Sequence, residues 1–306
     1  MKYDSSGAEL WAARYEGPGE VDDDARAIAV DDSGNVYVTG GSGGDYATVK
    51  YDSDGHEQWA VRYDGPSGGD DEAVAIGLDD AGNVYVTGTS EGEFATLKYD
   101  SDGNQVWAVR SPGSARAMVV GPSGGVYVTG VNEDRYTTIK YDSDGNELWV
   151  MGCYGSLCGP GEATAIALDQ SGNVYVTGTS YSGRNMNYGY ATVKYDSEGR
   201  QRWVARYDPF GGSKAQAADI AVDDAGNVFV TGSAMGAASD FVTVAYDTDG
   251  GQLWFDRYEG PGGGTDQAAA IAVDACGNAY VTGKSDGGDS CADFAVIKYV
   301  PRDQVE

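Results

Sequence analysis

The chain has 306 residues and a formal net charge of −28 at pH 7, and 41% of its residues are hydrophobic. This apolar content can supply a core, and the length fits one closed β domain as well as two ordinary domains. The negative charge disfavours nucleic acid and anionic membrane surfaces as partners, because both attract basic proteins. No apolar run approaches the ~20 residues of a membrane helix, and no signal peptide is apparent. We therefore expect no membrane insertion.

One sequence unit recurs along the chain. The box Val-Tyr-Val-Thr-Gly starts at Val36, Val84, Val126 and Val174, and variants of it start at Val228 and Ala279. Each copy has one tryptophan: Trp11, Trp59, Trp107, Trp149, Trp203 and Trp254. A fixed period of this size indicates a repeat architecture.

Each copy divides into four short runs rich in Val, Ile, Thr and Tyr, which is typical of strands. In the first copy these runs are residues 25–31, 35–40, 46–52 and 57–63. Asp-Asp-Ser-Gly and Ser-Asp-Gly join them, and such residues suit tight hairpins. Four antiparallel strands in each unit of ~40–50 residues predict the blades of an all-β propeller.

We predict a single domain over residues 1–306, a six-bladed β-propeller closed by its N-terminal strand. The blades are residues 25–63, 73–110, 115–152, 163–207, 217–258 and 268–300, the last completed by residues 8–15. The last copy lacks a tryptophan strand, whereas residues 9–15 form an unpaired fourth strand containing Trp11. Pairing them would hide two sheet edges. The chain starts within a repeated strand, so we expect a mature form or an excised domain.

The repeat resembles a known family. Asp-x-x-Gly-Asn-Val-Tyr-Val-Thr-Gly, followed by Ala-Thr-Val-Lys-Tyr-Asp-Ser-Asp-Gly-Asn-Glu-Leu-Trp, is similar to the bacterial SBBP-type β-propeller repeat over residues 2–300. The resemblance implies an extracytoplasmic module of bacteria or archaea, often part of a larger surface protein. It implies no defined activity, and a fold alone does not determine function.

Catalysis finds little support in the sequence. The only histidine, His56, occupies a hairpin position that holds Asn104 and Asn146 in other copies. We interpret His56 as a solvent-facing turn residue, and no Ser-His-Asp triad can be assembled without it. A single histidine also cannot form the histidine cluster of a zinc site. The repeated Asp-Ser-Asp-Gly lacks the spaced ligands and terminal Glu of an EF-type calcium loop, so we interpret it as a turn. We predict no enzyme and no required cofactor.

The cysteines point to an oxidising compartment. We define the top loops as those that enter each blade and those that join its second and third strands. Cys153 and Cys158 share one top loop and are predicted to form a short disulfide, which favours a secreted or cell-surface location. Cys276 and Cys291 are separated by about six strand residues at ~3.3 Å each, beyond the ~7 Å Cα limit for a bridge. We expect these two to stay apart.

Function is expected where the copies differ, mainly in the top loops. The entries of the first two blades are acidic, and Asp23, Asp24, Asp71 and Glu72 are candidate ligands for a hard cation such as Ca²⁺. They could equally contact a basic partner or be solvated acids.

A second candidate site lies in blades 3 to 5. The longest loop between second and third strands, residues 181–190, mixes aromatic rings with amide and guanidinium donors, which suit sugars or extended peptides. The candidate ligand-binding residues are Tyr181, Arg184, Asn185, Asn187 and Tyr188, with Tyr154 and Phe210 as expected neighbours. The alternative is an irregular loop that packs its own aromatic side chains.

The leading hypothesis is a non-enzymatic binding module, extracellular or on the cell surface, that presents its top loops to a protein or carbohydrate partner. We expect a monomer or a domain of a larger protein. One alternative is a purely structural spacer or assembly unit. Another is a metal-dependent lyase or hydrolase that uses the acidic blade entries.

Overall fold

The computed structural model describes residues 1–19, 21–154, 157–183, 187–209, 213–236, 238–288 and 292–300. Within these ranges the chain forms 25 β-strands and no helix, so the all-β prediction is confirmed. Accordingly, no helix in these ranges is long and apolar enough to cross a membrane. The chain divides into two compact units.

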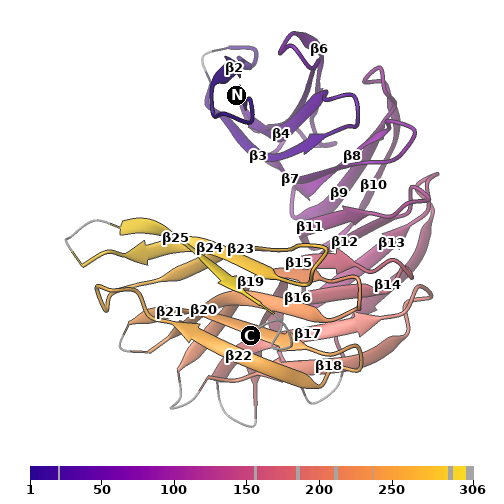
Figure 1. Cartoon of the computed structure of the whole chain (residues 1–306). Helices are drawn as coiled ribbons and strands as arrows, with labels where there is room; N and C mark the ends of the chain where they lie inside the picture. The colour runs from indigo at the N-terminus through magenta and orange to yellow at the C-terminus, as the bar shows by residue number, and fades with distance from the viewer. Residues whose placement is uncertain are drawn as a thin grey trace. The chain divides into compact units, whose positions relative to one another are not determined.

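The first unit comprises Met1–Val128 and Ile139–Leu148. Its first full sheet contains β3 (Asp23–Val30), β4 (Val36–Ser42), β5 (Asp45–Tyr51) and β6 (Glu57–Tyr63) in chain order (Figure 1). The next contains β7 (Asp71–Leu78), β8 (Val84–Ser90), β9 (Glu93–Tyr99) and β10 (Gln105–Pro112). The third sheet, which contributes residues to both units, contains β11 (Ser114–Val120), β12 (Val126–Asn132), β13 (Arg135–Tyr141) and β14 (Glu147–Gly152).

The second unit comprises Thr129–Thr138 and Trp149–Glu306. Its sheets are β15 (Gly161–Leu168), β16 (Val174–Ser182), β17 (Asn187–Tyr195) and β18 (Gln201–Tyr207), then β19 (Lys214–Val222), β20 (Val228–Met235), β21 (Ser239–Tyr246) and β22 (Gln252–Tyr258). A three-stranded sheet follows, with β23 (Gln267–Val273), β24 (Ala279–Asp286) and β25 (Ala292–Tyr299). Five sheets therefore have the predicted four strands in antiparallel order.

The N-terminal strand pairs differently from the prediction. β2 (Glu9–Trp11) pairs with β1 (Lys2–Tyr3), with Lys2 opposite Trp11 and Tyr3 opposite Glu9. Lys2 and Tyr3 repeat the end of a third strand, so they offer β2 a partner only a few residues away. A short hairpin costs little loop-closure entropy. The seven described sheets thus do not reproduce the expected six complete blades.

The repeated Asp-x-x-Gly-Asn-x-Tyr segment builds one turn. Asp79 Oδ1 accepts hydrogen bonds from the backbone amides of Ala81 and Asn83, at 3.0 and 2.9 Å. Its Oδ2 accepts from Asn83 Nδ2 at 2.8 Å and from the Tyr85 hydroxyl at 2.9 Å. Gly82 in this turn has a φ of +77°, which favours glycine. The same network recurs at Asp31, Asp169 and Asp274.

The second repeated turn receives a tryptophan from the preceding sheet. Trp59 Nε1 donates to the Ser101 carbonyl at 3.1 Å, and Lys50 Nζ donates to the same oxygen at 3.1 Å. The Trp59 ring lies against Gly103, where a Cβ would come within 2.9 Å of it. Asp100 accepts the amides of Asp102 and Asn104 within this turn. Asp-Ser-Asp-Gly is therefore a tryptophan-docking turn.

The core lies between successive sheets of each unit. In each of the five four-stranded sheets, the third strand packs one aromatic ring against the next sheet along the chain. The Tyr46 hydroxyl of β5, for example, donates to the Ala95 carbonyl of β9 at 3.2 Å. The counterparts of Tyr46 are also buried, with exposed fractions of 1% for Phe94, 3% for Tyr136, 0% for Tyr190 and 0% for Phe241. The repeat is thus a unit of inter-sheet packing.

Candidate ligand-binding groove

A groove of about 590 Å³ lies at the top-loop ends of the second unit. It is lined by side chains from the β12–β13 turn, the entry to β15, and the ends of β16, β17, β19 and β20: Val131, Asp134, Pro160, Glu162, Thr179, Tyr188, Lys214, Gln216 and Met235. Its volume lies in the range of about 300–1,000 Å³ that is usual for small-ligand sites.

An extended hairpin forms one side of the groove. β16 and β17 have nine residues each, whereas the corresponding β8 and β9 have seven. The added residues continue the antiparallel register, which places Tyr181 opposite Tyr188 and Ser182 opposite Asn187. Cross-strand aromatic pairs stabilise such an extension. The extra length brings Tyr188 to the groove.

Tyr188 stands between a second ring and a cation. Its ring centroid lies 5.2 Å from that of Tyr181. On the β19 side, Lys214 Nζ lies 5.4 Å from the Tyr188 centroid, within cation–π range. Tyr188 remains 38% exposed. The groove therefore contains an aromatic surface and an ammonium group side by side.

The remaining polar groups of the groove are mainly acceptors. Asp134 is exposed and Glu162 is half-buried, and the exposed Gln216 adds an amide. Carboxylates and amides hydrogen-bond well to hydroxyl groups. This arrangement is suited to binding a ligand with hydroxyl groups.

The structure separates the predicted ligand-binding residues. Tyr188 lines the groove and Tyr181 packs on it. Asn187 is buried, and its Oδ1 accepts the Tyr188 amide at 2.8 Å, so it supports the hairpin. Arg184, Asn185 and Phe210 lie outside the described residues. Sequence reasoning missed Lys214, Glu162 and Asp134, although Lys214 stands where the first two copies have Asp22 and Asp70.

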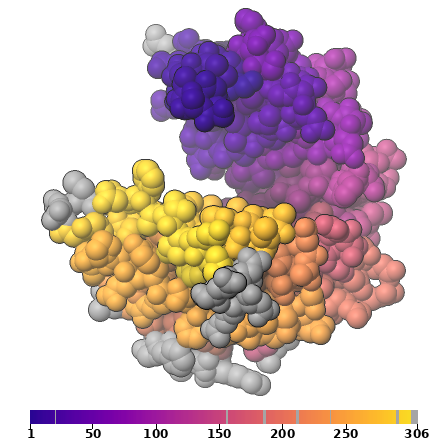
Figure 2. Space-filling view, viewed as in Figure 1, coloured from indigo at the N-terminus to yellow at the C-terminus, as the bar shows by residue number. Residues whose placement is uncertain are grey.

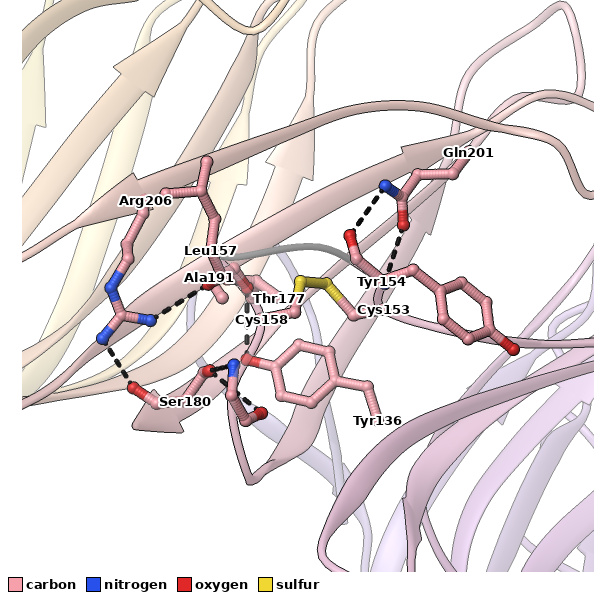
Figure 3. Close-up of a disulfide and its surroundings, with 11 residues drawn as sticks. Tyr136, Cys153, Tyr154, Leu157, Cys158, Thr177, Ser180, Ala191, Gln201 and Arg206 are labelled. Atoms are coloured by element: carbon pink, nitrogen blue, oxygen red, sulfur yellow. Dashed lines mark hydrogen bonds between the residues drawn. A yellow bond between two sulfur atoms is a disulfide. The ribbon is translucent and has the colours of Figure 1, made fainter. Parts of the chain in front are cut away.

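Tyr154 lies apart from the groove. Its backbone amide donates to Gln201 Oε1 at 2.9 Å, and Gln201 Nε2 donates to its carbonyl at 3.0 Å. Figure 3 shows its ring on the other side of the disulfide from Arg206. Tyr154 is 60% exposed, but it is not a neighbour of Tyr188 in the binding surface.

The predicted disulfide is present. Cys153 and Cys158 are bonded, with their Cα atoms 5.7 Å apart (Figure 3). Arg206 holds the same loop, since its guanidinium donates to the Leu157 carbonyl at 3.2 Å and to the Ser180 carbonyl at 2.7 Å. Cys276 is free and exposed in the turn after β23. Cys291 lies outside the described residues, so its separation from Cys276 stays a prediction.

The four predicted metal ligands contact other groups. Asp24 lies 2.6 Å from Arg26 Nε, and Glu72 contacts another nitrogen of the same guanidinium. Asp23 accepts the Gly17 amide at 2.9 Å, and Asp71 accepts the Gly65 amide. Asp24 and Glu72 therefore lie close together, as expected. The group that joins them is the Arg26 guanidinium, which the sequence reasoning did not consider.

A different trio brings carboxylates together. Among the described residues, Asp45, Asp64 and Asp71 each place one carboxylate oxygen within 4.8 Å of the others. Asp45 is also 2.7 Å from Arg62, which offsets part of this charge. Three side-chain oxygens are fewer than the about six to eight that Ca²⁺ takes. Of the four predicted metal ligands, this trio contains Asp71 alone.

The comparison with protein families rests on the repeat itself. The model of the SBBP β-propeller repeat matches residues 10–47, 61–95, 162–183 and 253–289. The chain carries SBBP-type repeats. No curated protein matches it in sequence.

Solved structures share the fold of the SBBP-repeat chain at low sequence identity. Virginiamycin B lyase from Staphylococcus aureus has a TM-score of 0.55 and 14% identity, over 92% of this chain and 85% of the lyase. A protein from Lactobacillus plantarum has a TM-score of 0.61 and 15% identity, over 90% and 84%. Domains 1–2 of Drosophila Semaphorin 1b give 0.52 and 10%, over 89% and 77%. Such identities support a propeller-like fold alone.

Comparison of the repeated copies with one another also shows what is unusual about the groove. Tyr188 lies on a hairpin longer than those of the first three copies, and Lys214 reverses the charge found in two of them. Both residues therefore depart from the repeat at the same place. Departures that converge in space indicate a site more strongly than either does alone.

Proposed function

We propose that this chain is a non-enzymatic extracytoplasmic binding module, and that it holds a carbohydrate in the groove beside Tyr188. The observation that carries the proposal is the pairing of the exposed Tyr188 ring with Lys214 in a groove of about 590 Å³. Aromatic faces pack on the C–H surfaces of sugars, while Asp134 and Gln216 in the same groove can hydrogen-bond to sugar hydroxyls. The disulfide at Cys153 favours a secreted or cell-surface location.

The lyase among the structural neighbours supports no enzymatic role here. A solved form of that lyase, also 14% identical to this chain, is catalytically inactive after a histidine is replaced by alanine. The single histidine of the present chain, His56, lies in an exposed turn with its Nδ1 3.3 Å from Asp52. His56 is a side chain of the docking turn, remote in sequence from every residue that lines the groove.

We also propose that the six copies close into a six-bladed propeller, with residues 9–15 as the fourth strand of the last blade. β25 ends its sheet without a fourth strand among the described residues. On it Phe294 is 85% exposed, whereas the five corresponding rings of earlier blades are buried. Part of this sheet, drawn in yellow, lies on the visible surface in Figure 2.

The first blade has a cavity that could receive the Phe294 ring. A cavity of about 420 Å³ there is lined by Ala25, Val36 and Ala47, among others. Their counterparts in the next sheet, Ala73, Val84 and Ala95, are buried beneath the inserted Tyr46 ring. Trp11 already donates to the Ser53 carbonyl at 3.0 Å, as the tryptophan of a preceding blade would. A third-strand ring is the side chain that this cavity fits.

The binding proposal is tested with the full chain on glycan and peptide arrays, followed by calorimetry on any ligand found. Tyr188→Ala should weaken binding by about tenfold or more, because aromatic side chains that a ligand covers dominate the binding energy of such sites. Tyr154→Ala is the matched control, as it removes an exposed tyrosine of the same unit outside the groove. Equal losses in both variants, or an array without any hit, would contradict the assignment.

A further inference from the structure

We infer that the groove selects a saccharide that bears a carboxylate, such as a uronic or sialic acid residue. This inference rests on the proposed binding function and adds the class of sugar. The observation that carries it is Lys214, the first residue of β19, which is exposed and lies beside the Tyr188 ring. Within the described residues, no carboxylate forms an ion pair with Lys214.

The charge at this position is an exception in a strongly acidic chain. The net charge is −28, and the first two copies have Asp22 and Asp70 where the fifth has Lys214. A long-range negative field repels anionic ligands in general. A ligand with one negative charge therefore needs a local cation at its binding site, and Lys214 supplies it.

The ammonium group is held in place before a ligand arrives. Lys214 Nζ lies 5.4 Å from the Tyr188 centroid, and Tyr188 is itself fixed by Tyr181 and by the register of the long hairpin. Such preorganisation lowers the entropic cost of binding. The same ring offers its exposed part to the sugar, so one ligand can contact both groups.

The other groove residues discriminate against alternative anions. Asp134 and Glu162 line the same groove as Lys214. The Asp134 carboxylate would repel an acidic peptide or a sulfated polymer, which carry several negative charges. The same carboxylate accepts hydrogen bonds from hydroxyl groups, which a sugar ring has on most of its carbons. A polyhydroxylated ring with one carboxylate matches both features.

The experiment compares charged sugars with their neutral esters on the full chain. The probes each carry one carboxylate: galacturonic acid and glucuronic acid as single residues, sialyllactose, and the methyl ester of each, measured by calorimetry. Methylation removes the charge and keeps the ring and its hydroxyls. At least one acid should bind about tenfold more tightly than its ester, as expected for a charge-assisted contact.

Two variants assign the preference to Lys214. Lys214→Met keeps an unbranched side chain against Tyr188 and should make acid and ester bind alike. Lys214→Asp introduces the residue of the first two copies and should favour the ester. Because Lys214 is exposed, both variants should melt as the wild type does, and a melting curve checks this.

The outcomes separate this inference from the proposed function. If esters or other neutral sugars bind as tightly as the acids, and Tyr188→Ala removes that binding, the function stands and the carboxylate inference is overturned. If no acid binds more tightly than its ester in any pair, the inference is likewise overturned. If no saccharide of either kind binds, both proposals fail. An acid preference that persists in Lys214→Met would overturn the role of the lysine.

Discussion

Asp79 and Asp24 have the same side chain, but Asp79 is hydrogen-bonded within a turn and Asp24 forms an exposed ion pair. The Asp79 carboxylate is enclosed by its own turn, with two backbone amides, an Asn amide and a Tyr hydroxyl bonded to it. Asp24 stands at a blade entry and pairs with Arg26, which also contacts Glu72. The first arrangement recurs in most copies, whereas an arginine at the position of Arg26 recurs only as Arg116. Residues repeated in most copies stabilise the blades here, whereas variable ones such as Arg26 shape the blade entries.

The largest effect should come from the repeated aromatic of the third strand. Phe94 is 1% exposed, and Phe94→Ala should reduce the free energy of unfolding by about 3–5 kcal/mol, as for a buried Phe that leaves a cavity. If the ring of blades closes, Phe294→Ala should cost a comparable amount despite the 85% exposure of Phe294 in the present structure. Guanidinium unfolding curves of the two variants measure both losses.

The Phe294 result tests closure directly. If Phe294→Ala leaves the free energy of unfolding unchanged while Phe94→Ala lowers it by the full amount, closure is contradicted and β25 is an unpaired edge strand of its sheet. A loss at Phe294 that grows with protein concentration would indicate pairing between two copies, because only association depends on concentration. Leu10→Ala, which truncates an exposed side chain of β2, is a control for general effects of truncation near the proposed seam.

A smaller loss of stability is expected when the side-chain hydrogen bonds of one repeated turn are removed. Asp79→Ala removes an acceptor of four hydrogen bonds and leaves the buried Tyr85 hydroxyl without its partner. Together these should cost about 2–3 kcal/mol. Asp24→Ala should cost less than about 1 kcal/mol, since an exposed ion pair contributes little. Thermal and guanidinium melts of the pair check the contrast, and equal losses would remove the distinction between turn and entry acids.

The same turn sets a pH dependence. Hydrogen bonds to Asn83 and Tyr85 lower the pKa of Asp79, although burial alone would raise it. A lowered carboxyl pKa gives stability that is fully present above the ordinary value of 3.8 and is lost as the pH falls through the folded-state pKa. The stability difference between wild type and Asp79→Ala should therefore shrink below pH 4.

The strands and turns were predictable because their determinants are local. Alternating side chains, Gly at positive φ and Asp at turn starts act within a few residues. The first strands begin at Asp23 and Asp71, earlier than the predicted residues 25 and 73, because these acids continue the register opposite Ser42 and Ser90.

The groove was only partly predictable because it depends on distant segments. The extra length of the hairpin is visible in the sequence, and it led to Tyr181 and Tyr188. That Lys214 meets Tyr188, while Tyr154 turns to Gln201, follows from packing between strands far apart in the chain. Likewise, Arg26 sits in an alternating strand pattern, which gave no reason to place it between Asp24 and Glu72.

The smallest effect concerns Asp219, which stands where other copies have alanine in the first strand. Burial raises its pKa, although amides of Ile271 and Ile220 donate to it, each at 2.8 Å. A raised carboxyl pKa means that the folded protein keeps a proton that the unfolded chain has lost. The contribution of Asp219 to stability is thus greatest below the ordinary value of 3.8 and falls as the pH rises through the folded-state pKa. This dependence has the opposite sign to that of Asp79.

Asp219→Asn should abolish this dependence, because the amide does not titrate. As the pH falls from 7 towards 4, the wild type should gain stability relative to the variant. This gain in the free energy of unfolding should be smaller than the reduction expected for Asp79→Ala. Guanidinium unfolding at matched ionic strength across this range measures the difference. If the difference between the two proteins stays constant over the range, burial does not perturb Asp219. If the wild type instead loses stability relative to the variant as the pH falls, the donated amides outweigh burial, and Asp219 behaves like the repeated turn acids after all.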